Sequence, residues 1–133
     1  MSHYTTIETK IRDREALLLA LADLGYPTVE THEQPAHLFG YMGEERPELA
    51  HVIIRRAQIG NLSNDIGFAR DEAGCYRAIV SEYDSREHGA DWQRRLAVRY
   101  GYHATVRAAQ RHGFRVTSET SIPATVNAGG RVG

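Results

Sequence analysis

Apolar and polar residues alternate near the start of the chain and then change to a helical spacing. From Thr5 to Ile11 the alternation is that of a half-buried strand. Asp13 is a good N-cap, and the strong helix formers REALLLALADL follow it. Gly25 and Pro27 favour the end of this helix, because glycine adopts the left-handed C-terminal conformation and proline stops continuation. The pattern therefore predicts a strand followed by a helix.

The next region has a weaker pattern. Thr28–Thr31 predicts a short strand. From Glu33 to Pro47 the chain is punctuated by Pro35, Gly40 and Gly43, which predicts a long loop. Loops of this length in compact domains are often functional. This loop is therefore one of two regions in which we expect a function to lie.

Three β segments then follow in close succession. They are HVIIRRAQI from His51, DIGFAR from Asp65 and CYRAIVSEY from Cys75. The links GNLSN and DEAG are rich in turn formers, and Gly74 is placed for a positive φ. Such short links predict three successive antiparallel strands, the last two forming a hairpin.

A helical pattern extends from residue 84 to 113, but its apolar residues fall on two sides. The first stripe comprises Trp92, Leu96 and Tyr100, and the second Tyr102, Val106 and Ala109. Gly101 separates the stripes, so we expect a break there, with helices near Asp91–Tyr100 and Tyr102–His112. The alternation of Phe114–Thr120 then predicts a closing strand.

The element order β-α-(β)-β-β-β-α-β predicts an α+β fold. We expect a single, mostly antiparallel sheet of about five strands, with the helices packed on one face. Consecutive apolar residues at Val52–Ile54 and Ile79–Val80 point to both faces of this sheet. An exposed apolar patch on the second face would imply a partner or a homo-oligomer. Residues 1–122 are expected to form the one domain, and residues 123–133 a weakly structured tail.

Length and composition narrow the class of protein. A chain of 133 residues buries roughly two thirds of its surface on folding, which suffices for one core. The single cysteine, Cys75, excludes an intramolecular disulfide and fits a reducing compartment. No signal peptide is recognisable, and no apolar run approaches the ~20 residues of a membrane span. These features predict a cytoplasmic protein.

The net charge of −1 hides a strong asymmetry. Residues 1–91 hold sixteen acids against nine basic residues, whereas residues 92–118 hold six arginines and no acid. The arginines are candidate partner-binding residues, with pairing to the acidic part of the same chain as the alternative. They are Arg94, Arg95, Arg99, Arg107, Arg111 and Arg115.

Several short blocks occur in a recognisable order. They are SHYTTIETKIRD at Ser2–Asp13, LGY at Leu24–Tyr26, NDIGFARDEAGCY at Asn64–Tyr76, RYGYH at Arg99–His103 and GF at Gly113–Phe114. Together they resemble the family catalogued as domain of unknown function 1257, which includes a conserved hypothetical reading frame of chloroplasts and cyanobacteria. The resemblance implies an AAA-type ATPase or a ferredoxin-like protein among the partners. It covers the chain from Ser2 to about Glu119, and departs at His32–Leu49 and after Ile122.

Residues that would carry chemistry are scarce. His32 and His37 form the one close histidine pair, but their spacing on a loop matches no strong metal-site pattern. Cys75 has no neighbouring base in the sequence and is best read as a small buried hydrophobe. Nucleotide-binding glycine motifs are absent from the sequence, so no cofactor is expected. Asp65 and Gly67 are expected to be structural, bracing a turn and allowing close packing.

Three function classes follow from these observations. The preferred hypothesis is a non-enzymatic interaction or adaptor subunit. The second is binding of nucleic acid or an acidic partner through the arginines of the helical region. The third is a metal-binding protein or enzyme that uses the loop after Pro27, and the sequence leans against an enzyme.

Overall fold

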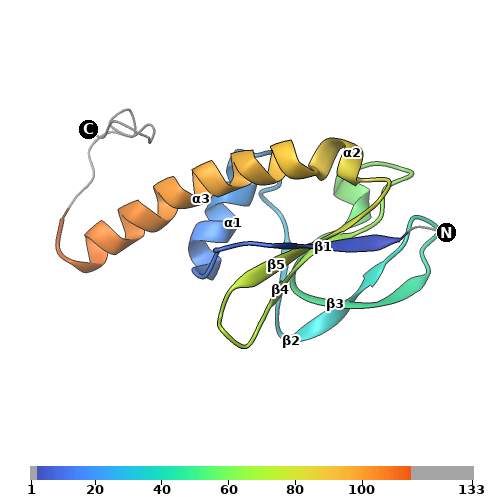
Figure 1. Ribbon diagram of the computed structural model, residues 1–133, viewed down its shortest axis with the longest axis horizontal. Coiled ribbons are helices and arrows are strands. Elements are labelled where there is room, and N and C mark those ends of the chain that lie inside the picture. The colour runs from blue at the N-terminus through green and yellow to red at the C-terminus, as the bar shows by residue number, and fades with distance from the viewer. Residues whose placement is uncertain (1–2, 115–133) are drawn as a thin grey trace.

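The computed structural model describes residues 3–114 of the chain (Figure 1). The strands are β1 (Tyr4–Glu8), β2 (Glu30–Phe39), β3 (Glu45–Ile54), β4 (Ile66–Arg70) and β5 (Tyr76–Ser81). The helices are α1 (Arg14–Asp23), the short α2 (Ser85–His88) and α3 (Ala90–Arg111), with a 3-10 turn at Arg56–Gln58. No helix within residues 3–114 is both long and apolar enough to cross a membrane.

The strands form one antiparallel sheet in the order β1-β5-β4-β3-β2. Helices α1 and α3 pack together over one face, which confirms the predicted α+β fold (Figure 1). The start of α1 follows the prediction, since the Asp13 side chain accepts a hydrogen bond from the Ala16 amide at 3.3 Å. The turn after α1 also follows it, because Gly25 has φ 103°.

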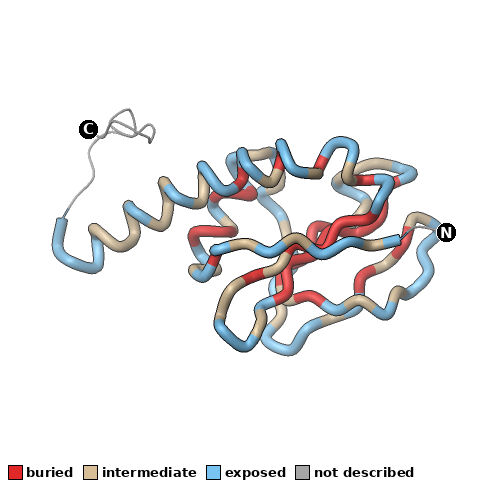
Figure 2. Tube along the Cα trace, viewed as in Figure 1, coloured by how far each residue is buried: buried red, intermediate tan, exposed pale blue. Residues whose placement is uncertain are grey.

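The core beneath the helices combines one face of every central strand with one side of each long helix. Its members include Leu17 and Leu21 of α1, Phe68 of β4, and Trp92 and Leu96 of α3. Figure 2 shows the buried residues concentrated in the central strands and α1. Burial of an aromatic or aliphatic side chain here contributes about 1.5–3 kcal/mol, so this layer dominates stability.

The second face of the sheet is also apolar, as predicted. Its buried cluster consists of Leu38, Ala50, Ile53, Ala69 and Ile79. The ring of Tyr4, from β1, lies 5.3 Å from the Arg46 guanidinium of β3, although two strands separate β1 from β3 in the sheet. The curled sheet therefore lets side chains from distant strands meet over this face.

Close packing at the centre of the sheet explains one residue of the DIGF block. A Cβ atom at Gly67 would lie 2.6 Å from the Cβ of Ala50 and 2.9 Å from Cδ2 of Leu38. Real Cβ atoms do not approach neighbours so closely, so β4 needs glycine at this position. The structural role predicted for Gly67 is thus confirmed.

The prediction of a long loop over Glu33–Pro47 is wrong. These residues form most of a hairpin, in which β2 pairs with β3 around a turn that places Gly43 at φ 82°. Pro35 lies at a register shift of the edge strand β2, a position where the missing N–H costs little. Pro47 lies in the part of β3 that does not pair with β4. Its missing N–H therefore removes no hydrogen bond between these two strands.

The predicted helix break at Gly101 is also wrong. α3 is continuous from Ala90 to Arg111, and Gly101 lies on its exposed side. The second apolar stripe does not mark a separate helix, because Tyr102 packs against Arg99 and His103 on the surface of α3. Glycine inside a helix costs only about 1 kcal/mol, which the packing of α3 outweighs.

The closing strand predicted from Phe114 to Thr120 lies outside the described residues, apart from Phe114 itself. The predicted tail over residues 123–133 also lies outside them. Both stay predictions.

Candidate partner-binding surface

Three loops meet at the end of the sheet that lies at the right in Figure 1. They are the β2–β3 turn (40–44), the segment before β4 (59–65) and the turn after β5 (81–84). We call this surface the loop end. The side chains and backbone of these loops converge on Asn64, which is completely buried.

Asn64 joins the three loops by hydrogen bonds. Its Oδ1 accepts from the backbone amide of Tyr41 at 2.9 Å. Its Nδ2 donates to the Ser81 hydroxyl at 2.9 Å, and its backbone amide donates to Oδ2 of Asp84 at 2.9 Å. Ser81 in turn donates to the same Asp84 oxygen at 2.8 Å. Buried polar groups that are satisfied in this way fix loop geometry, so the loop end is held in one conformation.

Each of the three loops exposes one large apolar side chain. The exposed fractions are 74% for Met42, 60% for Leu62 and 39% for Tyr83. Leu62 and Tyr83 border a pocket of about 330 Å³, which is also lined by Asp84, Arg86 and Glu87. Binding residues often lie on loops held by a rigid scaffold, so these three side chains are the candidate contact residues of the loop end.

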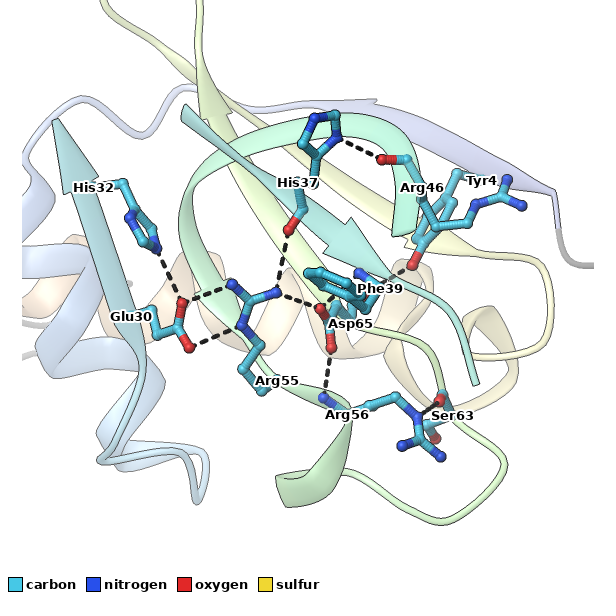
Figure 3. A network of polar contacts seen from close by, with 10 residues as sticks. All are labelled: Tyr4, Glu30, His32, His37, Phe39, Arg46, Arg55, Arg56, Ser63 and Asp65. Atoms are coloured by element: carbon cyan, nitrogen blue, oxygen red, sulfur yellow. Dashed lines mark hydrogen bonds and ion pairs between the residues drawn. The ribbon is translucent and has the colours of Figure 1, made fainter. Parts of the chain in front are cut away.

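The loop between β3 and β4 is braced by the carboxylate of Asp65 (Figure 3). This fully buried group accepts from the backbone amides of Phe39 and Arg56, both at 2.7 Å, and from the Arg55 guanidinium at 2.6 Å. Arg55 also binds both carboxylate oxygens of Glu30, at 2.8 and 2.7 Å. Asp65 therefore fixes the residue next to Asn64, as the prediction that it braces a turn requires.

A second anchor lies behind the loop end, where α2 packs on α3. Nε2 of His88 is 2.8 Å from the Tyr26 hydroxyl, and the His88 ring lies 4.8 Å from that of Trp92. Burial lowers the pKa of His88, so the neutral ring is favoured near neutral pH. This aromatic cluster holds the segment that follows Asp84 against the core.

The family model described as "Protein of unknown function (DUF1257)" matches residues 20–124. The chain belongs to the DUF1257 family. No curated protein and no solved structure matches the chain. The matched residues of this DUF1257 protein include all three loops and all of α3.

The arginines predicted to bind a partner have different surroundings in this DUF1257 protein. Arg99 donates to Asp23 and Arg107 to Asp13, both at 2.8 Å, so these two are paired with α1. Arg94 pairs with Asp91 of its own helix at 2.6 Å, while Arg111 lies 3.9 Å from Asp13. Arg95 is exposed and makes no hydrogen bond or ion pair with the described residues, and Arg115 lies outside them. The structure thus does not gather these arginines into one free surface, and their binding role stays a prediction.

The candidate metal residues lie on β2 of the DUF1257 domain. Nε2 of His32 is 3.0 Å from Glu30, while Nδ1 of His37 is 2.7 Å from the carbonyl oxygen of Arg46. Among residues 3–114, no group of three or more His, Cys, Asp or Glu residues could hold a metal ion. Cys75 is a free, half-buried thiol directly before β5. The predicted positive φ of Gly74 is confirmed at 90°.

The sequence did not indicate the residues that build the loop end. Asn64 is 17 residues from Ser81 and 20 from Asp84, and all three residue types are ordinary in turns, so no local pattern indicates that they meet. Leu62 offered the one usable signal, since an apolar residue within GNLSN has no core position to fill. Asn64 and Asp65 begin the NDIGFARDEAGCY block, and their hydrogen bonds hold the loops of this surface together.

The ion pair between Glu30 and Arg55, which is drawn in Figure 3, leads to a pH prediction. Its hydrogen bonds to Arg55 lower the pKa of Glu30 from 4.5 to about 2. A lowered carboxyl pKa stabilises the folded state above pH 4.5, and this stability is lost as the pH falls towards 2. In Glu30→Gln, the free energy of unfolding should depend less on pH over this window than in wild type. The difference should be small, because the Glu30 side chain is nearly half exposed. Urea unfolding at several pH values measures this dependence. If the free energy of unfolding of Glu30→Gln changes with pH as much as that of the control Glu72→Gln, the ion pair is not the cause.

Proposed function

We propose that this DUF1257 protein is a non-enzymatic interaction subunit that binds a partner protein through the loop end. The observation that carries the proposal is the display of Met42, Leu62 and Tyr83 on three loops tied to one buried asparagine. Binding by a preorganised surface loses little conformational entropy, which favours affinity. The pocket beside Leu62 and Tyr83 offers a place for an anchoring side chain of the partner.

The charge around the loop end supports a basic partner. The exposed charged residues in and directly beside the loop end, over residues 40–45 and 81–88, are four acids and one arginine: Glu44, Glu45, Glu82, Glu87 and Arg86. Arg86 stacks on the Tyr83 ring, with its guanidinium 4.2 Å from the ring centroid, and so extends the apolar rim of the pocket. We therefore expect the partner to present basic residues around an apolar side chain, because complementary charge speeds encounter and fixes orientation.

A pull-down from the native host tests this proposal. The double variant Met42→Ser/Leu62→Ser should recover at least about tenfold less partner than wild type, because two exposed apolar anchors are removed. The partner recovered by wild type is then identified by mass spectrometry. An AAA-type ATPase or a ferredoxin-like protein is the class proposed from the family resemblance.

The matched control is Val98→Ser, which removes an apolar side chain of similar exposure, 63%, from α3. It should leave recovery of the partner unchanged. Raising the salt concentration should weaken recovery by wild type, since exposed charges are screened. Equal recovery by wild type and the double variant would refute a binding role for the loop end.

A further inference from the structure

The sheet has an open edge along β1. Tyr4 is opposite Ser81 in the register, so His3 is opposite Glu82, and the Glu82 amide donates to the His3 carbonyl at 2.7 Å. In an antiparallel ladder, the residues between such hydrogen-bonded pairs direct their N–H and C=O groups away from the partner strand. The backbone groups of Thr6 and Glu8 therefore face outward, where no described strand pairs with β1.

A groove lies beside this edge, under the first half of α3. Its volume is about 420 Å³. It is lined by Ile7, Thr9 and Ile11 on one side and by Ala90, Ala97 and Tyr100 on the other. Ile7 belongs to the helix-facing side of the sheet, so the groove continues the main core past its last strand. An added strand beside β1 would thus place every second side chain in the groove.

The chain itself contains a segment of matching pattern. Phe114 and Val116 alternate with polar residues in Phe114–Thr120, and Phe114 is 70% exposed where α3 ends. The open edge offers backbone partners, and the groove offers apolar contacts for such a segment.

Chain length argues against pairing of this segment with the groove of its own copy. The groove ends at Tyr100, and the rise along α3 to Phe114 is about 21 Å at 1.5 Å per residue. The end of α3 extends beyond the sheet in Figure 1. A return over this distance takes about six or seven extended residues at 3.3 Å each, which uses up the alternating segment before it arrives.

We propose that Phe114–Thr120 of one copy adds as a strand to the open edge of β1 in a second copy. Phe114 and Val116 then fill the groove under α3 of that second copy. Exchange in both directions gives a closed dimer with the same contact twice. The inference is independent of the proposed function, because it uses a different edge of the molecule from the loop end.

The test compares the molar mass of full-length variants by size-exclusion chromatography with light scattering. Thr6→Pro removes only an outward-facing N–H and places a ring on the edge, so it blocks strand addition while keeping the pairing with β5. Phe114→Asp/Val116→Asp removes the apolar side chains of the added segment. We expect wild type and the control Thr6→Ala to have the mass of a dimer, and both test variants that of a monomer.

Mixing the two test variants separates exchange between copies from pairing within one. Thr6→Pro keeps an intact segment, and the double aspartate variant keeps an intact edge, so the mixture should associate although neither does so alone. The proposal is overturned by a wild type that stays monomeric over a roughly hundredfold range of concentration. It is equally overturned if Thr6→Pro stays dimeric, or if the mixed variants fail to associate at any concentration.

Discussion

Asp65→Ala should destabilise the protein by about 3–5 kcal/mol, the largest effect that we expect from a single polar substitution. Asp65 is completely buried and accepts three short hydrogen bonds, two of them from backbone amides. Its removal leaves the amides of Phe39 and Arg56 without their acceptor and deprives Arg55 of one of its two carboxylates. For a slope of about 2 kcal/mol/M, the midpoint of urea unfolding should fall by roughly 2 M.

The control for this substitution is Glu72→Ala. Glu72 is an exposed acid in the hairpin turn, so its removal changes the charge equally but should shift stability by less than about 0.5 kcal/mol. Similar midpoints for the two variants would show that Asp65 does not brace the fold. Asp65→Asn distinguishes charge from hydrogen bonding, since the amide keeps one acceptor oxygen for a backbone N–H.

Asn64→Ala should cost about 2–4 kcal/mol, because it leaves buried polar groups unpaired and opens a small cavity. The Tyr41 amide loses its acceptor, and Ser81 loses the Nδ2 donor. Beyond stability, we expect the amide of Tyr41 to exchange its hydrogen faster, because the β2–β3 turn is released from the rest of the loop end. Urea unfolding and hydrogen exchange followed by NMR measure the two effects.

Asn61→Ala provides the matched control from the same turn. Its side chain is exposed, and only its backbone carbonyl accepts a hydrogen bond, from Arg56. If the loop end is a binding surface, Asn64→Ala should also weaken partner recovery, whereas Asn61→Ala should not. Unchanged exchange at Tyr41 in Asn64→Ala would mean that the asparagine does not couple the loops.

Local pattern predicted the elements in which neighbours in sequence are also neighbours in space. The strand before Asp13, the helix that follows and the hairpin around Gly74 all obey short-range rules of capping, spacing and turn formation. The apolar character of both sheet faces was also readable, because side chains in a strand alternate between faces. These features need no knowledge of distant contacts.

The two errors have a common physical cause. Pro35 and Gly101 are unfavourable in a strand and in a helix respectively, so local rules placed a loop and a break there. Glycine inside a helix costs only about 1 kcal/mol, which tertiary packing outweighs. Pro35 lies on an edge strand where its missing N–H is tolerated, and Gly101 lies within a helix anchored by Trp92 and Leu96.

By itself, the sequence determined the α+β class, the family and the structural role of Asp65 and Gly67. Only the tertiary structure decided which residues form a surface. The loop end depends on hydrogen bonds between Asn64 and residues 17 to 23 positions away, and the groove depends on α3 lying beside the open edge of β1. Such contacts are set by how the sheet and helices pack, and no pattern of neighbouring residues encodes them.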